Sequence, residues 1–577
     1  MALTPGARIV ITIVIAIAVV SAAAMAAVVV LVTRGPDVPD ESVLWLRLPA
    51  ELAERQPDDL LSQLGGPRAT VSSVVGALRK AAADDRIRTV VLAPSPQPAP
   101  WATAQEIRGA VEAFRASGKR IVAYLELGSS QAYYLASACD EVYLAPTSPL
   151  DLVGVSIYEL FARNALDKIG VYPDMLHAGD FKTAANIYTE TTFTPAHREM
   201  DESLARDFYD QLVIGVARGR GLPAADVRAL IDEGPFLGDA ARARGGTDGL
   251  LYEDELLERV AESDEPAERL SLADYRRVDP ASLGLGGGPS IAVVYVVGAI
   301  VHGDGGGLDG TAGAATLMNS LRAAREDDDI EAIIVRINSP GGGAIASDLI
   351  WREIALAGEE KPVVASMSDL AASGGYYVAM PADVIVAQPG TLTGSIGVVG
   401  GKLALGGAFE KLGVSIEAVS AGRMAEMNSI ATPYSDEARV RVQQQIDAIY
   451  EEFLARAAEG RGMTRDAVHA VAQGRVWTGR QARDIGLVDE LGGMDAAVSA
   501  AKRLAGIDAG REVTLVPYPR PRTFFEVLND GFTIRAGILN ALRPVSPAAA
   551  AVDAAAAPLR LFRPGEPLAL MPQVYIR

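Results

Sequence analysis

The chain has 577 residues, of which 49% are hydrophobic and 22% are charged, and its formal net charge at pH 7 is −20. This length exceeds what one hydrophobic core usually supports, so two or more domains are expected. The acidic balance argues against a general affinity for nucleic-acid phosphates, and no nucleic-acid partner is expected.

Residues 9–33 form the first predicted element, an uncharged apolar segment between Arg8 and Arg34. A helix that crosses a bilayer needs about 20 apolar residues, whereas the apolar core of a signal peptide usually spans about 7 to 15. We therefore expect an uncleaved membrane anchor over residues 1–35, with a signal peptide cleaved near the small residues 21–27 as the alternative. The acidic segment that follows is unlike a cytoplasmic flank, so the catalytic part is expected on the extracytoplasmic side of the cell membrane.

Two long parts of the chain match each other at an offset of 243 residues. The segment "VVGALRKAAADDRIRTVVL" from Val74 aligns with "LMNSLRAAREDDDIEAIIV" from Leu317. The segment "AYYLASACDEVYLAP" from Ala132 aligns with "GYYVAMPADVIVAQP" from Gly375, and the match continues after a two-residue slip. The chain therefore contains two copies of one domain.

Each copy alternates between predicted helices and strands. The polar helical stretch 320–329 precedes the β-branched runs 330–338 and 361–368, which suit strands buried on both faces of a mostly parallel sheet. The predicted class is α/β, with a tail whose Ala/Pro-rich part and apolar end indicate flexible or membrane-adjacent structure. We assign residues 36–285 to the first repeat, 286–515 to the second and 516–577 to the C-terminal tail.

Ser373 is the candidate nucleophile of the second copy. It lies in "DLAASGGYYVAM" (369–380), where small residues let the backbone approach a substrate carbonyl and leave the Gly374 N–H free as a donor. The first copy keeps Ser130 but has Gln131 at the position of Gly374. A serine hydroxyl needs a base to take its proton at neutral pH, so a base has to lie elsewhere in the sequence.

A glycine loop also distinguishes the copies. The second copy has "NSPGGG" (338–343) where the first has "SPQPAP" (95–100). Three flexible glycines with N–H donors therefore align with Pro98, Ala99 and Pro100. Proline has no N–H to donate. The first copy is therefore not expected to be a hydrolytic centre.

Lys182 is the candidate base. The segment "AGDFKTA" (178–184) aligns with "AGRMAEM" (421–427), so the second copy, which has the glycines beside its serine, lacks the lysine, and the first copy, which lacks those glycines, has it. These complementary losses predict one site shared by the two copies, within a chain or between chains. A desolvated lysine can become neutral, and to act as a base its pKa must fall from about 10.4 to about 7 or 8.

Four motifs resemble the bacterial signal peptide peptidase A family in its long form with two fused repeats. They are "RINSPGGG" (336–343), "SDLAASGGYYVA" (368–379), "TGSIGVVG" (393–400) and "GDFKTA" (179–184), together with the N-terminal anchor. The resemblance covers residues 40 to 510 and implies tandem Clp-protease/crotonase-like domains. It also implies a membrane-anchored serine endopeptidase with a serine/lysine dyad that degrades remnant signal peptides, assembled as a homotetramer.

Carried over by residue, the resemblance makes Ser373 the nucleophile and Lys182 the general base. It makes the Gly374 N–H, with that of Gly341 or Gly342, the oxyanion hole. Ser395 in "TGSIG" becomes the hydroxyl that holds the lysine amine. The sequence contains no metal-ligand or phosphate-binding motif of convincing spacing, so no metal or cofactor is expected.

Other functions remain open at this point. A Ser-His-Asp hydrolase would need His177, His197, His302 or His469 as its base, and His177 lies nearest to Lys182. A non-catalytic membrane-anchored scaffold or a crotonase-type acyl-CoA protein could use the same fold. A scaffold would not need Ser373 and its glycine donors in one copy only.

Overall fold

The computed structural model describes residues 36, 38–55, 68–97, 99–261, 268–305, 310–520 and 565–576. The membrane anchor predicted over residues 9–33 lies outside these ranges. Within them, no helix combines the length and the apolar character that a bilayer span requires.

The first copy is built on a sheet in which every described strand pair is parallel. Its strands in spatial order are β10 (Gly249–Leu250), β5 (Glu141–Leu144), β3 (Arg120–Leu125), β2 (Ile87–Ala93), β1 (Ser42–Arg47) and β11 (Arg269–Ser271). The helices of this copy include α3 (Val71–Ala83), α4 (Trp101–Ala116), α5 (Ser130–Ala136), α9 (Ala224–Glu233), α10 (Gly238–Ala243) and α11 (Glu253–Ala261). The apolar run in β2 is fully buried at Val90, Val91 and Leu92, as the sequence predicts for a strand covered on both faces.

The second copy repeats this strand order. Its strands are β22 (Glu490–Leu491), β18 (Val384–Ala387), β17 (Val363–Ala372), β15 (Ile330–Ser339), β12 (Ser290–Val297) and β23 (Thr514–Tyr518), again all parallel. Its helices include α13 (Ala314–Glu326), α14 (Ala344–Gly358), α15 (Gly374–Ala379), α16 (Gly406–Lys411), α17 (Asp436–Arg461), α18 (Arg465–Val471), α19 (Gly479–Asp484) and α20 (Met494–Leu504). The strands β19 (Leu392–Gly394) and β21 (Val476–Thr478) extend the sheet beyond β17. The predicted α/β class and the duplication are therefore confirmed.

A further sheet joins distant parts of the chain. In spatial order it contains β14 (Ala312–Gly313), β13 (Ile300–Val301), β16 (Gly341–Gly343), β24 (Leu568–Leu570), β20 (Val398–Ala404) and β8 (Tyr172–Ala178). The strand β8 belongs to the first copy and forms a continuous antiparallel ladder with β20 of the second. This ladder carries the loop after β8 into the second copy.

The apolar C-terminal end differs from the flexible segment that its composition predicts. Residues 568–570 form β24, which is buried and pairs antiparallel with both β16 and β20. A strand edge offers unpaired N–H and C=O groups, and an apolar extended segment satisfies them.

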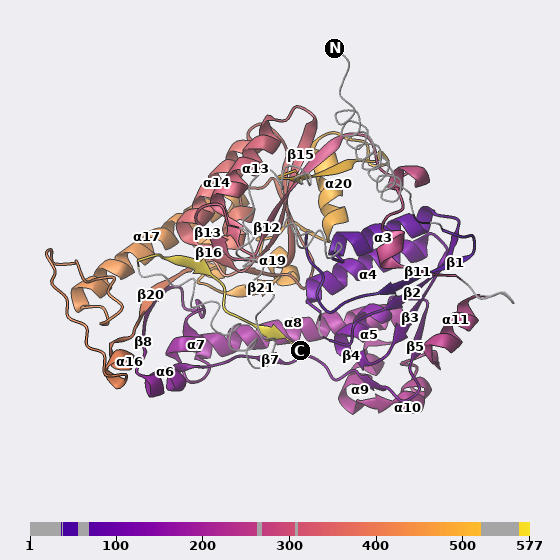
Figure 1. The fold of residues 1–577 in the computed structure, drawn as a ribbon, viewed down its shortest axis with the longest axis horizontal. Helices are drawn as coiled ribbons and strands as arrows, with labels where there is room; N and C mark the ends of the chain where they lie inside the picture. Colours follow the sequence, from indigo (N-terminus) through magenta and orange to yellow (C-terminus); the bar gives the residue numbers. More distant parts are fainter. Residues whose placement is uncertain are drawn as a thin grey trace, which may run out of the picture.

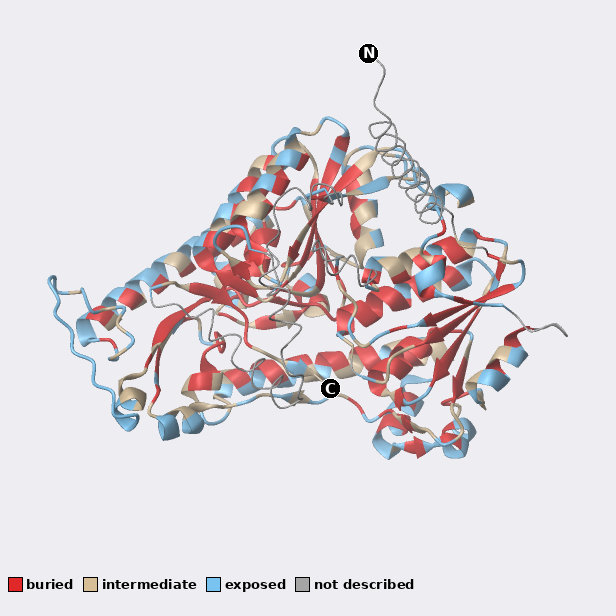
Figure 2. Cartoon of the chain, in the orientation of Figure 1, coloured by how far each residue is buried: buried red, intermediate tan, exposed pale blue. Residues whose placement is uncertain are grey.

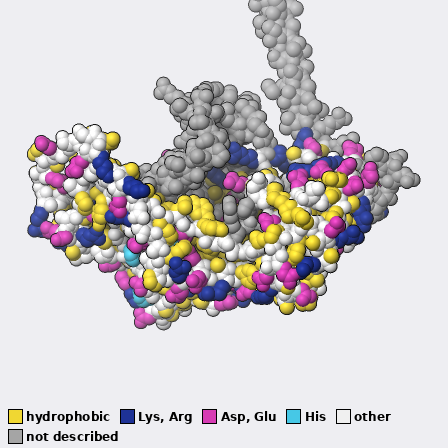
Figure 3. Space-filling view, turned by 90° about the horizontal axis from the view of Figure 1, so that it is seen from below, with side chains coloured by type: hydrophobic (Ala, Val, Ile, Leu, Met, Phe, Trp, Pro, Cys, Tyr) yellow, Lys and Arg dark blue, Asp and Glu magenta, His cyan; other side chains and the backbone are white. Residues whose placement is uncertain are grey.

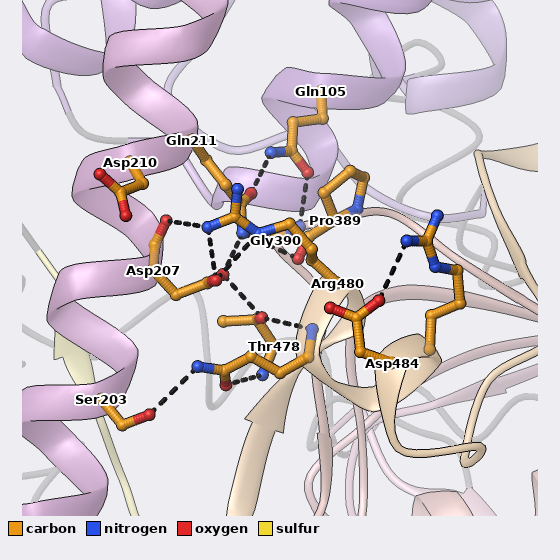
Figure 4. A network of polar contacts seen from close by, with 12 residues as sticks. Gln105, Ser203, Asp207, Asp210, Gln211, Pro389, Gly390, Thr478, Arg480 and Asp484 are labelled. Carbon is orange, nitrogen blue, oxygen red and sulfur yellow. Dashed lines mark hydrogen bonds and ion pairs between the residues drawn. The ribbon is translucent and has the colours of Figure 1, made fainter.

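Helix α8 (Pro195–Arg220) of the first copy runs along the lower side of the molecule and contacts the second copy (Figure 1). The Asp207 carboxylate accepts hydrogen bonds from Arg480 at 2.6 Å and from Thr478 Oγ1 at 2.7 Å (Figure 4). Two buried ion pairs also join the copies. Arg336 of β15 donates to Glu54 and to Glu106 of the first copy. Buried residues fill the sheets of both copies (Figure 2). The polar contacts of Asp207 and Arg336 join the two copies to each other.

Candidate active site

Ser373 lies at the turn between β17 and α15. Its backbone has φ 55° and ψ −113°, a conformation that L-residues rarely adopt and that often marks a functional site. The Ser373 N–H donates to Gly394 O at 2.8 Å, and the Ser373 carbonyl accepts from Tyr377 N–H at 2.8 Å. These bonds fix the strained turn, and the side chain is fully buried.

Lys182 of the first copy meets Ser373 of the second in the same chain. The Lys182 Nζ lies 2.7 Å from Ser373 Oγ, 2.8 Å from Ser395 O and 3.1 Å from Ser395 Oγ. Lys182 is 1% exposed. The structure therefore brings together the three side chains that the sequence predicts, and the contact between the two copies is within one chain.

The environment of Lys182 favours a neutral amine. Burial holds the Lys182 pKa well below its ordinary value, because the ammonium form loses its hydration. In the described part of the chain no carboxylate forms an ion pair with Lys182 to oppose this effect. The amine contacts hydroxyl and carbonyl oxygens instead, which a neutral lysine can also bind.

Two segments position Lys182. The ladder between β8 and β20 pairs Ala178 with Val398, so the loop after β8 and the turn before β20 leave the sheet at the same end. The Phe181 N–H then donates to Gln473 O at 2.8 Å. A Cβ on Gly474 would lie 2.5 Å from Lys182 Cα, so only glycine allows this approach.

Gln473 and Gly474 are site residues that sequence reasoning missed. Gln473 has φ 53° and supports the lysine loop through its carbonyl rather than through a side chain. The signal in the sequence is a Gln-Gly pair before a strand, which indicates a turn but no chemistry.

Ser395 occupies the turn after β19. It has φ 51°, and its N–H donates to Arg475 O at 2.7 Å. Its hydroxyl and its carbonyl both face the Lys182 amine. This is the position that the resemblance implies for the hydroxyl that holds the lysine.

The glycines of the second copy are packed against one another. A Cβ on Gly341 would lie 2.7 Å from Gly374 N, and a Cβ on Gly374 would lie 2.6 Å from Ser347 Oγ. The Gly341 N–H donates to Ser339 Oγ at 3.1 Å. Of the two alternatives for a second oxyanion donor, Gly341 is therefore engaged within its own loop and Gly342 pairs with Ala569 of β24, whereas the Gly374 N–H is at the start of α15, where helical N–H groups lack intrahelical partners.

The strand β24 lies against this glycine loop. The Met571 N–H donates to Pro340 O at 2.9 Å, and the Ala344 N–H donates to Pro567 O at 3.2 Å. In an antiparallel ladder this alternation makes Gly342 and Ala569 the hydrogen-bonded pair between them. An extended segment of the chain itself therefore lies beside the site, between β16 and β20.

The histidines lie apart from Ser373. His177 Nδ1 contacts Gly179 O, His469 Nδ1 contacts Tyr450 OH, and His302 faces Glu566 at 3.7 Å. His197 is buried beside Glu159 and Asp201. The hydrogen-bond partner of Ser373 Oγ among the described residues is Lys182, which leaves a Ser-His-Asp triad without a base.

Comparison with known proteins identifies the family. The family model for Peptidase family S49 matches residues 113–266 and 355–508, one segment in each copy. The chain is 36% identical over 491 residues to Serine protease SPPA, chloroplastic, of Arabidopsis thaliana, which covers 84% of this chain and 72% of that protein. It is 32% identical over 503 residues to Protease 4 of Salmonella typhi, which covers 82% and 78% respectively.

Among solved structures, ClpP1 from Listeria monocytogenes matches with 18% identity and a TM-score of 0.22, over 34% of this chain and 89% of that one. The sequence relatives and the family model agree with the resemblance that the motifs indicate. The chain belongs to peptidase family S49, the signal peptide peptidase A family, and is a serine peptidase.

Proposed function

We propose that this chain is a membrane-anchored endopeptidase that degrades remnant signal peptides through a Ser373–Lys182 dyad. The observation that carries the proposal is the 2.7 Å contact between Lys182 Nζ and Ser373 Oγ. The contact is buried and free of an opposing carboxylate, which keeps the amine neutral. Arginine could not replace this lysine, because a guanidinium stays charged.

The reaction is an acyl transfer. The neutral Lys182 amine takes the proton of Ser373 Oγ as that oxygen attacks the peptide carbonyl. The resulting ammonium gives the proton to the leaving amine when the C–N bond breaks, and the acyl group stays on Ser373. Lys182 then takes a proton from water, whose oxygen attacks the ester carbonyl. The Lys182 ammonium returns that proton to Ser373 Oγ as the C–O bond breaks and the acid is released. The Gly374 N–H, with that of Gly341 or Gly342, stabilises the oxyanion in both halves.

The substrate binds as an added strand. The antiparallel contacts of β24 with β16 and β20 support this mode, because they are main-chain contacts that an extended peptide can also make. The residues of β24 are Leu-Ala-Leu and are buried. Apolar signal-peptide remnants have the same character, so we propose them as the substrate class.

Membrane attachment and assembly complete the proposal. Residues 9–33 anchor the chain in the cell membrane, and the catalytic part lies on the extracytoplasmic side. Four copies form a homotetramer, as the family resemblance implies. The face viewed from below carries several groups of apolar side chains (Figure 3), which supports contact with a partner copy or a membrane.

Labelling with a fluorophosphonate tests the dyad. We expect the full chain to be labelled at Ser373 and both Ser373→Ala and Lys182→Ala to lose the label, with cleavage of an apolar peptide lost in parallel. Variants of each histidine to alanine should keep the label. A label retained in Lys182→Ala and lost in one histidine variant would establish a Ser-His-Asp hydrolase, and no label in the wild type would favour the scaffold.

A further inference from the structure

A second cluster of chemically active side chains lies in the first copy, away from Ser373. His197 and Asp201 are one turn apart on α8, and Glu159 follows β7 (Ile157–Tyr158). The His197 Nε2 lies 3.6 Å from Asp201 Oδ2 and 3.9 Å from Glu159 Oε1. One ligand atom of each residue lies within 4.8 Å of those of the other two.

These groups are buried without hydrogen-bond partners. The side chains of His197, Asp201 and Glu159 are 2%, 7% and 5% exposed. His197 Nε2, Glu159 Oε1 and both Asp201 carboxylate oxygens have no hydrogen-bond partner among the described residues. Burying such groups unsatisfied costs about 1–3 kcal/mol each, and burial raises the pKa of Asp201 to about 7. The cluster therefore needs something that its own residues do not supply.

The long helix of the second copy has no polar groups at the two equivalent positions. In the second copy, Lys402 occupies the position of Glu159, 243 residues further along the chain. The corresponding positions on α17, displaced by 241 residues, are the buried Ala438 and Val442. The second copy thus has apolar side chains at both helix positions and a lysine bonded to the Met427 and Ser429 carbonyls at the third, so nothing in the shared fold calls for a histidine and two carboxylates at this place.

We propose that Glu159, His197 and Asp201 bind a divalent transition-metal ion of the zinc class. Two ligand atoms about 2.1 Å from one tetrahedral zinc ion lie about 3.4 Å apart, close to the 3.6 Å and 3.9 Å observed. An imidazole nitrogen with two carboxylates suits zinc, whereas Mg²⁺ and Ca²⁺ prefer oxygen ligands throughout. The fourth position takes water.

Aromatic rings and an amide surround His197. The rings of Phe161 and Phe193 pack against His197 at centroid distances of 6.0 Å and 4.9 Å, which gives the site an apolar shell. The Asn186 side-chain amide lies 3.5 Å from His197 Nδ1 and orients the ring so that Nε2 faces the carboxylates. Asn186 is four residues after Lys182, so the ion braces α8 against the segment that carries the lysine.

Metal titration of the full chain tests the site. After chelation and dialysis, we expect Zn²⁺ alone to bind at one equivalent per chain, measured by elemental analysis, and to raise the Tm with increasing concentration. Co²⁺ alone should give the visible absorption of a tetrahedral site. Glu159→Gln and Asp201→Asn should each weaken binding by more than the roughly 10–100-fold loss typical of outer-shell changes.

His302→Ala is the matched control, because His302 also faces a carboxylate but at a site without a third ligand. It should bind Zn²⁺ like the wild type. Retained fluorophosphonate labelling shows that each variant is folded. The proposal is overturned if the wild type binds no zinc, if it binds Mg²⁺ or Ca²⁺ in preference, or if the two variants bind zinc as the wild type does. A rise in Tm in Asp201→Asn without metal binding in the wild type would identify a proton-sharing cluster instead.

Discussion

Lys182 is a buried amine whose contacts are oxygens of Ser373 and Ser395. In the unfolded chain a lysine has a pKa near 10.4, and burial lowers the Lys182 pKa well below that value in the folded protein. Between the two pKa values the unfolded chain binds a proton that the folded protein does not. Stability therefore rises with pH across this window, and the buried lysine destabilises the protein at neutral pH.

Lys182→Met should be inactive but more stable than the wild type at pH 7. Methionine fills a similar volume without a group that needs hydration, and the gain in Tm should shrink as the pH rises towards about 10.4. Thermal unfolding of both proteins across this range measures the difference. Lys182→Arg, which stays charged, should be inactive and less stable; parallel Tm curves for the wild type and Lys182→Met would contradict a lowered lysine pKa.

Sequence comparison singled out Ser373 and Lys182 because the first copy has the lysine and the second has the glycine donors beside its serine. That signal lies in the residue types at aligned positions, so it can be recognised from the sequence alone. Gln473 supports the lysine loop through its carbonyl, and Glu159 joins His197 across 38 residues of chain, so neither has a spacing that reveals its role. The engagement of the Gly341 and Gly342 N–H groups also needed the structure, since it depends on where each N–H is directed.

The strand β24 shows how a short element can control access to the site. It lies between β16 and β20, and a Cβ on Gly341 would lie 2.0 Å from the carbonyl oxygen of Ala569. The glycine loop thus allows the backbone of β24 to approach closely. The proline-containing loop of the first copy would not allow the same approach, because its side-chain atoms would clash. An apolar end in the sequence indicates burial, but only the open edges of two strands determine where it is buried.

Removal of residues 565–577 should speed fluorophosphonate labelling of Ser373 by about tenfold or more. The two main-chain hydrogen bonds of Pro567 and Met571 contribute about 0.5–1.5 kcal/mol each, and each 1.4 kcal/mol corresponds to about tenfold in occupancy. Labelling rates measure the effect. Truncation after residue 574, which removes the two-residue strand β25 (Tyr575–Ile576) and keeps β24, is the control.

An unchanged rate in the longer truncation would mean that β24 does not obstruct the site. A slower rate together with a lower Tm would mean that β24 is needed to hold the glycine loop in place.

At the scale of the whole molecule, the two copies differ in what their equivalent segments pair with. The counterpart of β8 in the second copy, residues 415–421, is an exposed stretch without strand pairing in the described structure (Figure 2). The counterpart of β20 in the first copy, residues 155–161, pairs only through the short β7 with β25. A second chain that repeats the β8–β20 contact would join these two segments, and repetition of this contact would close the homo-oligomer that we propose.

Ile416→Lys combined with Val419→Lys should therefore convert the assembly to single chains. Both side chains are exposed on this segment, at 51% and 106%, and two added charges oppose burial in an interface. Light scattering in detergent measures the size. Leu237→Lys, at an exposed apolar position of the first copy, is the matched control and should leave the size unchanged.

Single chains should still label at Ser373. An unaltered size in the double variant would rule out this segment as the contact, and loss of labelling in single chains would mean that a neighbour completes the site.

The β8–β20 ladder lies inside one polypeptide, so the contact between Lys182 and Ser373 does not depend on the protein concentration. Dilution cannot separate the two halves, and no concentration threshold governs their encounter. In a closed assembly of such chains, β8–β20 contacts within a chain would alternate with the equivalent contacts between chains. A contact between chains would have no catalytic lysine, because Ala425 stands at that position. Fusion of the copies thus sets the number of catalytic centres by the number of chains rather than by the number of domains.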